Sequence, residues 1–487
     1  MIESISVVLR RQVPVRDEPV RSWIGGLPMM PANVDWPVGP TIDYPERGMT
    51  PLHFVAQIAC ADLPAELWGG LGPRSGWLLL FFNAQDWTVE EDSQAVRVLH
   101  ISELGPERKP PPGIFPVHDE MYSGPDYCFV RSQDDIPVSW RRWPVNLVVI
   151  PNRAIEGKRH PTIIPENFAS ILYDGAPVRE GRVDPPTMVP FTWRGLLYVV
   201  DSVARVLSKE HRLKLDGAHE KLVTPGWATE AAAAINKELA GWMKASVIHN
   251  PPYVPSDDRD RRALEAAEAR GLKTMERLRS ARQLIVDSAD GMTVLTRIEQ
   301  SHQDFAGWRE AALQRVETLR EQILAHDLDA AVPIGDWEVL QKILENDRQP
   351  YWILRRADRA TLLPELIDRS LLDYADDGLR AAQVELAADY YVSPELRNLV
   401  PTELVRCMEP HWRSLYNNRP HRMGGTYDGI QSDATERPTG SVLLFQIATD
   451  SAMNWMWGDV GAYYVFIDTD RLAAGDFSKL DCLFECH

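Results

Sequence analysis

The chain has 487 residues, which is too long for one ordinary hydrophobic core, so two or more domains are expected. Apolar residues make up 44% of the sequence and charged residues 25%, as in globular proteins. The 70 Asp and Glu residues outnumber the 52 Lys and Arg residues, which gives a net charge of −18. This charge argues against a nucleic-acid-binding protein, because phosphate contacts need clustered positive charge. It favours solubility and would steer a basic partner towards the surface.

The N-terminal stretch MIESISVVLRRQV is typical of a first strand rather than of a signal peptide, since its arginines follow the apolar run. No apolar run approaches the ~20 residues that span a bilayer. The five cysteines are few, odd in number and dispersed, which suits a reducing compartment. We therefore expect a bacterial cytoplasmic protein that does not act at a membrane.

Residues 1–190 contain short apolar runs bounded by Gly, Pro, Asn or Asp, and this pattern predicts strands. The runs are HFVAQIAC, GWLLLFFNA, AVRVLHIS and VNLVVIP. After about residue 416 the pattern of short apolar runs recurs in SVLLFQIAT, GAYYVFIDT and LDCLFECH. This succession predicts an antiparallel meander.

Residues 191–415 have the periodicity of helices. In this zone six apolar residues repeat at steps of three and four, which places them on one helical face: Phe305, Trp308, Ala312, Val316, Leu319 and Ile323. We therefore predict an α+β protein in which one β-rich domain, formed by residues 1–190 and 416–487, carries an inserted all-α helical domain at 191–415. A separate C-terminal β domain would give the same pattern.

The two β-rich zones resemble each other in order and spacing. Each has a Gly-Gly pair, then Gln-Ile-Ala, then a glycine followed by Phe five residues later and Asn or Asp seven residues later. The matching stretches are 57–62 with 446–451 and 76–83 with 461–468. An internal duplication would place Gln57 and Gln446 in equivalent positions of two sheet units. Short apolar strands also resemble one another by chance, so both interpretations stay open.

Several stretches resemble the YwqG-like family, a bacterial family of unknown function with a sheet-rich α/β fold. They lie at about residues 20–85 and 420–487: SWIGGLPMMPANVDWP, PLHFVAQIACADLP, HRMGGTYDGIQ, LLFQIATD, MWGDVGAYYVFID and DFSKLDCLFEC. The helical zone has no counterpart in this resemblance. Some members of the family lie near bacterial toxin loci, so the resemblance implies a toxin-neutralising, immunity-like role as one expectation.

Standard catalytic signatures are absent from the sequence, including a Walker A loop and a Gly-x-Ser-x-Gly elbow. We assign no catalytic residue and expect no cofactor. Cys482 and Cys486 lie four apart on one face of a predicted strand, about 13 Å along it, too far to share one zinc ion. They are interpreted as core cysteines, and no metal site is expected.

The stretch NWMWGDVGAYYVFID at 454–468 is the strongest candidate for a binding corner. Asp459 could act as a base there, two tryptophans could stack on a ligand, and Asp35-Trp36 could face them in a cleft. The favoured interpretation is structural, because Gly and Asp are common in tight turns. Lone histidines near the end of the helical zone, His411 and His421, are expected at the surface or in caps. The candidate binding residues are Asp35, Trp36, Gln57, Gln446, Trp455, Trp457 and Asp459.

We expect a non-catalytic binding protein whose acidic surface covers a basic protein partner. The alternative is an enzyme acting on a small polar molecule in a cleft between the sheet units, with Asp459 and Asp35 as its carboxylates. In a third interpretation the helical zone is an oligomerisation module. The sequence identifies neither the partner nor the oligomeric state.

Overall fold

The structure is a computed structural model of the whole chain. It describes residues 5–86, 93–117, 136–151, 189–209, 218–248, 258–288, 290–357, 361–414, 419–431 and 440–487. These residues form two units. The first contains residues up to Tyr198, a short piece at Asp329–Ala331 and the stretch Leu379–His487, and the second contains Val199–Leu328 and Val332–Gly378.

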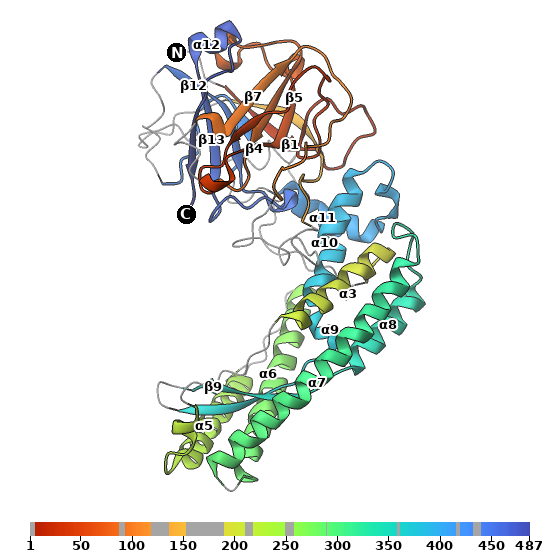
Figure 1. Cartoon of the computed structure of the whole chain (residues 1–487), viewed down its shortest axis with the longest axis vertical. Helices are drawn as coiled ribbons and strands as arrows, with labels where there is room; N and C mark the ends of the chain where they lie inside the picture. Colours follow the sequence, from red (N-terminus) through yellow and green to blue (C-terminus); the bar gives the residue numbers. More distant parts are fainter. Residues whose placement is uncertain are drawn as a thin grey trace. The chain divides into compact units, whose positions relative to one another are not determined.

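Strands from both ends of the chain pair in one antiparallel sheet, which has ten strands in the described part of the first unit (Figure 1). The strand order is β14-β13-β12-β11-β1-β8-β2-β5-β6-β7, and the sheet is nearly closed. The predicted α+β fold with a central helical region is therefore confirmed. The strands are β1 (Ile5–Arg11), β2 (Trp23–Ile24), β5 (His53–Ala59), β6 (Trp77–Phe82), β7 (Val96–Ile101), β8 (Trp143–Pro151), β11 (Arg422–Met423), β12 (Ser441–Ala448), β13 (Ala462–Asp468) and β14 (Asp481–Glu485). A separate hairpin joins β3 (Val38–Pro40) and β4 (Met49–Pro51).

The strand order is symmetric about the central β1–β8 pair. We call β8, β2, β5, β6 and β7 the first half-sheet, and β1, β11, β12, β13 and β14 the second half-sheet. The register shift between Phe54 and Ala56 in β5 has a counterpart between Leu443 and Phe445 in β12. Each shift ends one residue before the strand's glutamine. The two halves therefore share strand order and irregularities as well as sequence motifs.

Alternate residues of each strand point to opposite faces of the sheet. In β6, Leu78, Leu80 and Phe82 belong to the large shared core, whereas Leu79 and Phe81 belong to a smaller cluster on the other face. In the second half-sheet the residues Tyr464 and Phe466 of β13 form an equivalent outer cluster with Tyr427 and Leu443. Each half-sheet thus has its own outer cluster, and both contribute to one inner core.

The first unit, which we call the sheet unit, also contains two helices from the predicted insertion. They are α10 (Asp376–Val392), from Leu379 onwards, and α11 (Thr402–Arg413). Leu386, Tyr390, Met408 and Trp412 are buried in the same core as the strands. The sheet unit therefore resumes at Leu379, whereas the expected boundary was residue 416. Helical periodicity shows which face of a helix is buried, but not which element buries it.

The second unit is mainly helical and has its own core, which includes Trp227, Leu278, Ile285 and Val294. Its elements are α4 (Ala218–Leu222), α5 (Trp227–Ile248), α6 (Asp258–Val286), α7 (Gly291–Leu324), α8 (Ile334–Asn346), β9 (Tyr351–Arg356), β10 (Leu362–Ile367) and α9 (Leu371–Tyr374), and α3 (Trp193–Ser208) crosses the boundary between the units.

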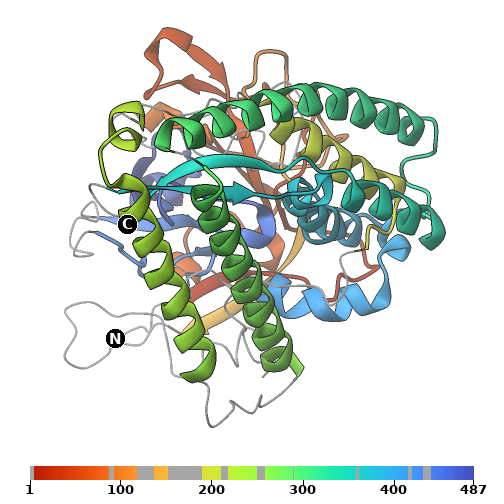
Figure 2. The ribbon, with the colours of Figure 1, turned by 90° about the horizontal axis from the view of Figure 1, so that it is seen from below.

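The predicted apolar face at 305–323 is confirmed in α7, where Phe305, Ala312, Val316 and Ile323 are buried. The antiparallel β9–β10 hairpin was not expected in this zone. Figure 2 shows the hairpin, in teal, alongside α6 and α7. No helix in the described ranges is long and apolar enough to cross a membrane.

Candidate functional site

The Trp457-Gly458-Asp459 corner is a tight turn packed against the end of β14. Gly458 and Val460 both adopt positive φ angles, 52° and 59°. A Cβ atom at Gly461 would lie 2.4 Å from the Glu485 carbonyl oxygen, so only glycine fits there. The local backbone is therefore determined by close packing between two chain segments.

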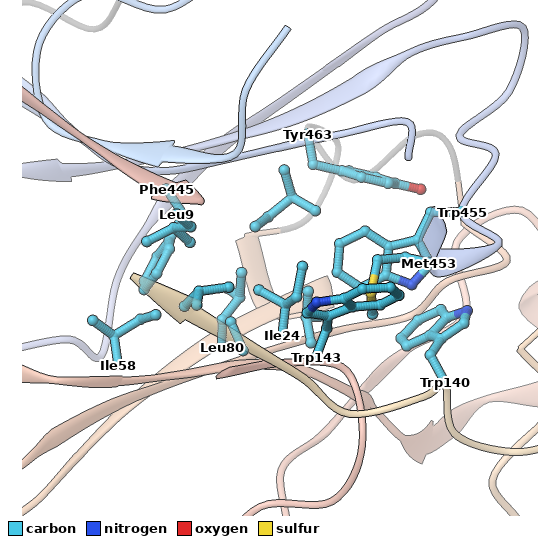
Figure 3. Close-up of a cluster of buried hydrophobic side chains, with 14 of the residues drawn as sticks. Leu9, Ile24, Ile58, Leu80, Trp140, Trp143, Phe445, Met453, Trp455 and Tyr463 are labelled. Carbon is cyan, nitrogen blue, oxygen red and sulfur yellow. The ribbon is translucent and has the colours of Figure 1, made fainter. Parts of the chain in front are cut away.

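The two tryptophans of the corner lie in the inner core. Trp455 is 0% exposed and Trp457 is 2% exposed. Their rings lie 5.5 Å apart, and both approach the ring of Trp140 from the N-terminal zone, at 5.5 and 5.7 Å. Figure 3 shows Trp455 and Trp140 in this core. The Trp457 indole N–H donates to the Ala448 carbonyl oxygen at 3.0 Å. Because other side chains cover these rings, they offer no open face on which an external ligand could stack.

The two candidate carboxylates are on exposed residues. Asp459 and Asp35 both lie at the surface of the first unit. In the turn, the Asp459 carbonyl oxygen accepts a hydrogen bond from the His487 amide at 2.8 Å. Neither aspartate belongs to a buried polar cluster of the described residues.

Trp36 and Trp457 pack on opposite faces of β6. The Trp36 ring lies 5.4 Å from Phe81 in the outer cluster of the first half-sheet. The Trp457 ring lies 5.4 Å from Phe82, which points into the inner core. The expectation that Asp35-Trp36 faces the Trp-Gly-Asp corner is therefore wrong, because neighbouring residues of a strand point to opposite sides of the sheet.

Gln57 is fully buried at the junction of β5 and β2, where it pairs with Trp23 in the strand register. Its Oε1 accepts from the Met29 amide at 2.9 Å, and its Nε2 donates to the Met29 carbonyl oxygen at 3.3 Å. The side chain thereby fixes the loop that follows the Gly25-Gly26 pair.

Gln446 occupies the equivalent position in the second half-sheet, where it pairs with Arg422 in the register and is also fully buried. Its Oε1 accepts from the Asp428 amide at 3.0 Å, and its Nε2 donates to the Asp428 carboxylate at 3.1 Å. Nε2 also donates to the Pro420 carbonyl oxygen. Met29 and Asp428 each lie four residues after the first glycine of their pair, so the two glutamines make the same loop contact.

Arg422 adds a buried charge to the second of these two arrangements. The side chain is 0% exposed, and its Nε and Nη2 donate to Gln446 Oε1 at 3.2 and 3.0 Å. Nη2 also lies 2.9 Å from an Asp428 carboxylate oxygen. Burial lowers the pKa of Arg422 despite the opposing effect of Asp428. Nη1 is buried and has no hydrogen-bond partner among the described residues.

The loop that bears Asp428 is fixed from two further sides. The Tyr464 hydroxyl donates to the Asp428 carbonyl oxygen at 2.6 Å. The Glu485 carboxylate accepts from the backbone amides of Ile430 and Gln431. We call Arg422, Asp428 and Gln446 the Arg422 cluster.

A second buried polar network is centred on Asp450 and His421. The Asp450 carboxylate pairs with the Arg11 guanidinium and accepts from His421 Nε2 at 2.9 Å. The Ala448 amide donates to His421 Nδ1 at 3.1 Å, which leaves the proton of the neutral ring on Nε2. Burial, together with the nearby Arg11 guanidinium, lowers the pKa of His421 to about 3. Because both ring nitrogens are bonded and the ring stays neutral, we assign it a structural role.

His421 and Arg422 were not predicted as buried residues. The expectation that His421 lies at the surface or in a cap is wrong, because the residue is 1% exposed. The signal that was missed is the similarity of HRMGG to SWIGG. Aligning the two Gly-Gly pairs places Arg422 at the position of the buried Trp23. His411 is half-buried, and burial lowers its pKa to about 4.

The described residues contain no group of three or more His, Cys, Asp or Glu side chains that could hold a metal ion. Cys482 is partly buried and packs against the inner core, and Cys486 is partly exposed. What the site offers chemically is therefore a buried guanidinium, an amide and a carboxylate in the outer layer of the second half-sheet.

Comparison with known proteins identifies one family. A family model described as a domain of unknown function, DUF1963, matches residues 22–153 and 341–486. The two matched segments flank a central region that includes most of the helical unit, and the second begins within α8. No curated protein matches the chain. Because the matched segments cover more than half of the sequence, the chain belongs to the DUF1963 family. In this chain the two matched segments are separated by a helical insertion.

Proposed function

We propose that this chain is a non-catalytic binding protein that associates with a basic protein partner. Its most specific form is a YwqG-like, toxin-neutralising protein of a bacterial cytoplasm. The observation that carries the proposal is that the candidate cleft residues form hydrogen bonds within the chain itself. Gln57, Gln446 and Trp457 direct their polar atoms to the chain's own loops and strands, so they are engaged in holding the fold together.

An acidic end of the second half-sheet suits a basic partner. Asp481 lies opposite Phe466 in the strand register, two residues from Asp468 along β13. Asp470 follows at the start of α12 (Thr469–Ala474), and both Asp470 and Asp481 are exposed. Exposed carboxylates gathered at one end of a sheet attract positive charge and accelerate association, an effect that salt weakens.

Occlusion is the mechanism that follows from this arrangement. An acidic surface that covers the basic face of a toxin would block that face without any chemical step. Such a complex needs about 1,200–2,000 Å² of buried surface, so apolar contacts must accompany the charges. Exposed apolar residues of the sheet unit include Val38 and Met49 on the β3–β4 hairpin.

The test is capture of partners from the native host by the full-length chain at low and high salt. We expect a basic protein to bind at low salt and to be released as salt rises. The double variant Asp470→Lys/Asp481→Lys should lose that protein. Asp35→Lys/Asp459→Lys is the matched control, because it reverses two charges at exposed aspartates outside the acidic end, and it should retain the partner. Capture that is insensitive to salt and to the double variant would contradict the proposal.

The alternative enzyme would need Asp35 and Asp459 in one cleft. Their neighbours Trp36 and Trp457 pack on opposite faces of β6, so no observation favours that site.

A further inference from the structure

We infer that the Arg422 cluster binds a small oxyanion, a carboxylate or a phosphate group, through the Nη1 atom of Arg422. This inference goes beyond the proposed function, because it concerns a site in the outer layer of the second half-sheet and requires no protein partner. It rests on three observations: the equivalent residue in the other half-sheet, the incomplete bonding of the guanidinium, and the closeness of the cluster to the surface.

The first observation is that a tryptophan occupies the equivalent position in the first half-sheet. Trp23 pairs with Gln57 as Arg422 pairs with Gln446. The glycine pairs that follow have the same left-handed conformation, with φ of 65° and 69° at Gly25 and Gly26 and 70° and 72° at Gly424 and Gly425. An uncharged aromatic side chain therefore satisfies the same backbone in the first half-sheet.

The second observation is that a buried charge has a large desolvation cost, which must be offset by full hydrogen bonding and charge pairing. Asp428 and Gln446 occupy Nε and Nη2 of Arg422, while Nη1 is buried without a partner in the described part of the chain. An oxyanion at Nη1 would accept from its N–H groups and balance the charge. Arginine is well suited to this role, since its N–H groups match carboxylate and phosphate oxygens.

The third observation concerns access. Asp428, which lies 2.9 Å from Arg422 Nη2, has a side chain that is 13% exposed, so the cluster reaches the surface at this residue. The charges near the cluster include two carboxylates, Asp428 and Glu485, and a second arginine, Arg419, which acts on Tyr464. The Glu485 carboxylate is occupied by two backbone amides, so it does not neutralise Arg422 directly.

The test is the thermal unfolding midpoint of the full-length chain in sodium phosphate, sodium acetate and sodium chloride at equal ionic strength. We expect phosphate or acetate to raise the midpoint by about 3 °C relative to chloride, because a ligand that binds the folded state stabilises it. A response to phosphate alone identifies a phosphate site, and a response to acetate identifies a carboxylate site. Equal midpoints in all three salts would overturn the inference.

Two variants separate the site from general salt effects. Arg422→Met should abolish the anion-dependent rise. Arg142→Met should keep it, because Arg142 stacks on Trp23 in the first half-sheet at 3.9 Å. A rise that persists in Arg422→Met would overturn the inference. If that variant does not fold, wild-type crystals grown in the stabilising salt give an independent result. Density for the anion within hydrogen-bond distance of Nη1 supports the site, and a water molecule there overturns it.

Discussion

The two half-sheets have the same framework but differ in one buried position. Both have a Gly-Gly pair, a strand with a buried glutamine and a register shift just before that glutamine. Where the first half-sheet has Trp23, the second has Arg422. The difference shows that an uncharged indole can occupy this buried position, so the second half-sheet carries the desolvation cost of a fully buried guanidinium that the first half-sheet avoids.

The same difference changes what each glutamine does. Gln57 exchanges two hydrogen bonds with the backbone of Met29. Gln446 makes the corresponding contact with Asp428 and also accepts from the Arg422 guanidinium. Bonds to a charged group are stronger than bonds between neutral groups, and an unpaired charge is costlier than an unpaired amide. Substitutions in the second half-sheet should therefore cost more than their equivalents in the first.

The largest expected effect is that of Asp428→Ala. The variant leaves Arg422 buried without its carboxylate and should lower the free energy of unfolding by about 3–5 kcal/mol. Met29→Ala is the matched control, because Met29 occupies the equivalent position and contacts Gln57 through its backbone, which the substitution retains. Urea denaturation measures both. Adding Arg422→Met to Asp428→Ala should recover part of the lost free energy of unfolding. Equal losses for Asp428→Ala and Met29→Ala would contradict the expectation that the charged cluster makes the second position costlier to change.

The next effect compares the two glutamines. Gln446→Leu removes an acceptor from a buried guanidinium and should cost about 3 kcal/mol or more. Gln57→Leu leaves neutral backbone groups of Met29 unpaired, which costs about 1–3 kcal/mol. The two unfolding curves, recorded under one set of conditions, give the difference directly. A larger loss for Gln57→Leu would reverse the comparison.

A smaller effect depends on pH. Histidines from both halves of the sequence contribute, because burial lowers the pKa of His53 and of His411 to about 4 and that of His421 to about 3. The unfolded chain binds protons at these residues below pH about 6.5 while the folded chain does not, so stability falls as the pH falls. The loss is about 1.4 kcal/mol per pH unit for each histidine, and the His53 contribution ends near pH 4 while that of His421 continues to about 3.

Asp86 acts in the opposite direction, because burial raises the pKa of its carboxyl to about 6. The folded chain retains that proton between pH about 4 and 6, which offsets the effect of one histidine in that range. Unfolding free energies of the wild type and His53→Gln, measured from pH 7 to 4, test the assignment. The variant should show a shallower dependence on pH, and an unchanged slope would contradict a neutral His53.

The smallest effect is expected at the exposed carboxylates. Asp35→Asn and Asp459→Asn should each change the free energy of unfolding by no more than about 0.5 kcal/mol, because surface substitutions away from buried polar groups are usually neutral. Both variants should keep the anion-dependent rise in unfolding midpoint. A loss of several kcal/mol at Asp459 would show that its carboxylate supports the turn.

Part of this architecture could be predicted because it depends on local pattern. Short apolar runs bounded by turn residues predicted the strands at both ends of the chain. Of the two interpretations left open for the repeated Gly-Gly and Gln-Ile-Ala motifs, the duplication placed Gln57 and Gln446 in equivalent positions, as the strand register has them. The buried face of α7 followed from steps of three and four residues. Periods of two and 3.6 residues are properties of a single element, so a sequence displays them directly.

Other features could not be predicted because they depend on which elements meet. Leu386 and Trp412 lie on helices like those of the second unit, yet they are buried in the sheet's core. Trp36 directly follows Asp35, and Trp457 lies two residues before Asp459, yet the two rings pack on opposite faces of β6.

The sequence by itself determined the secondary elements, the repeated motifs and the acidity of this protein, since these follow from composition and periodicity. Only the tertiary structure decided that Arg422 takes the place of Trp23 in a buried layer, with Nε and Nη2 paired and Nη1 without a partner among the described residues. The physical reason is that burial and hydrogen-bond completeness depend on the residues packed around a side chain, and these come from segments far apart in the chain.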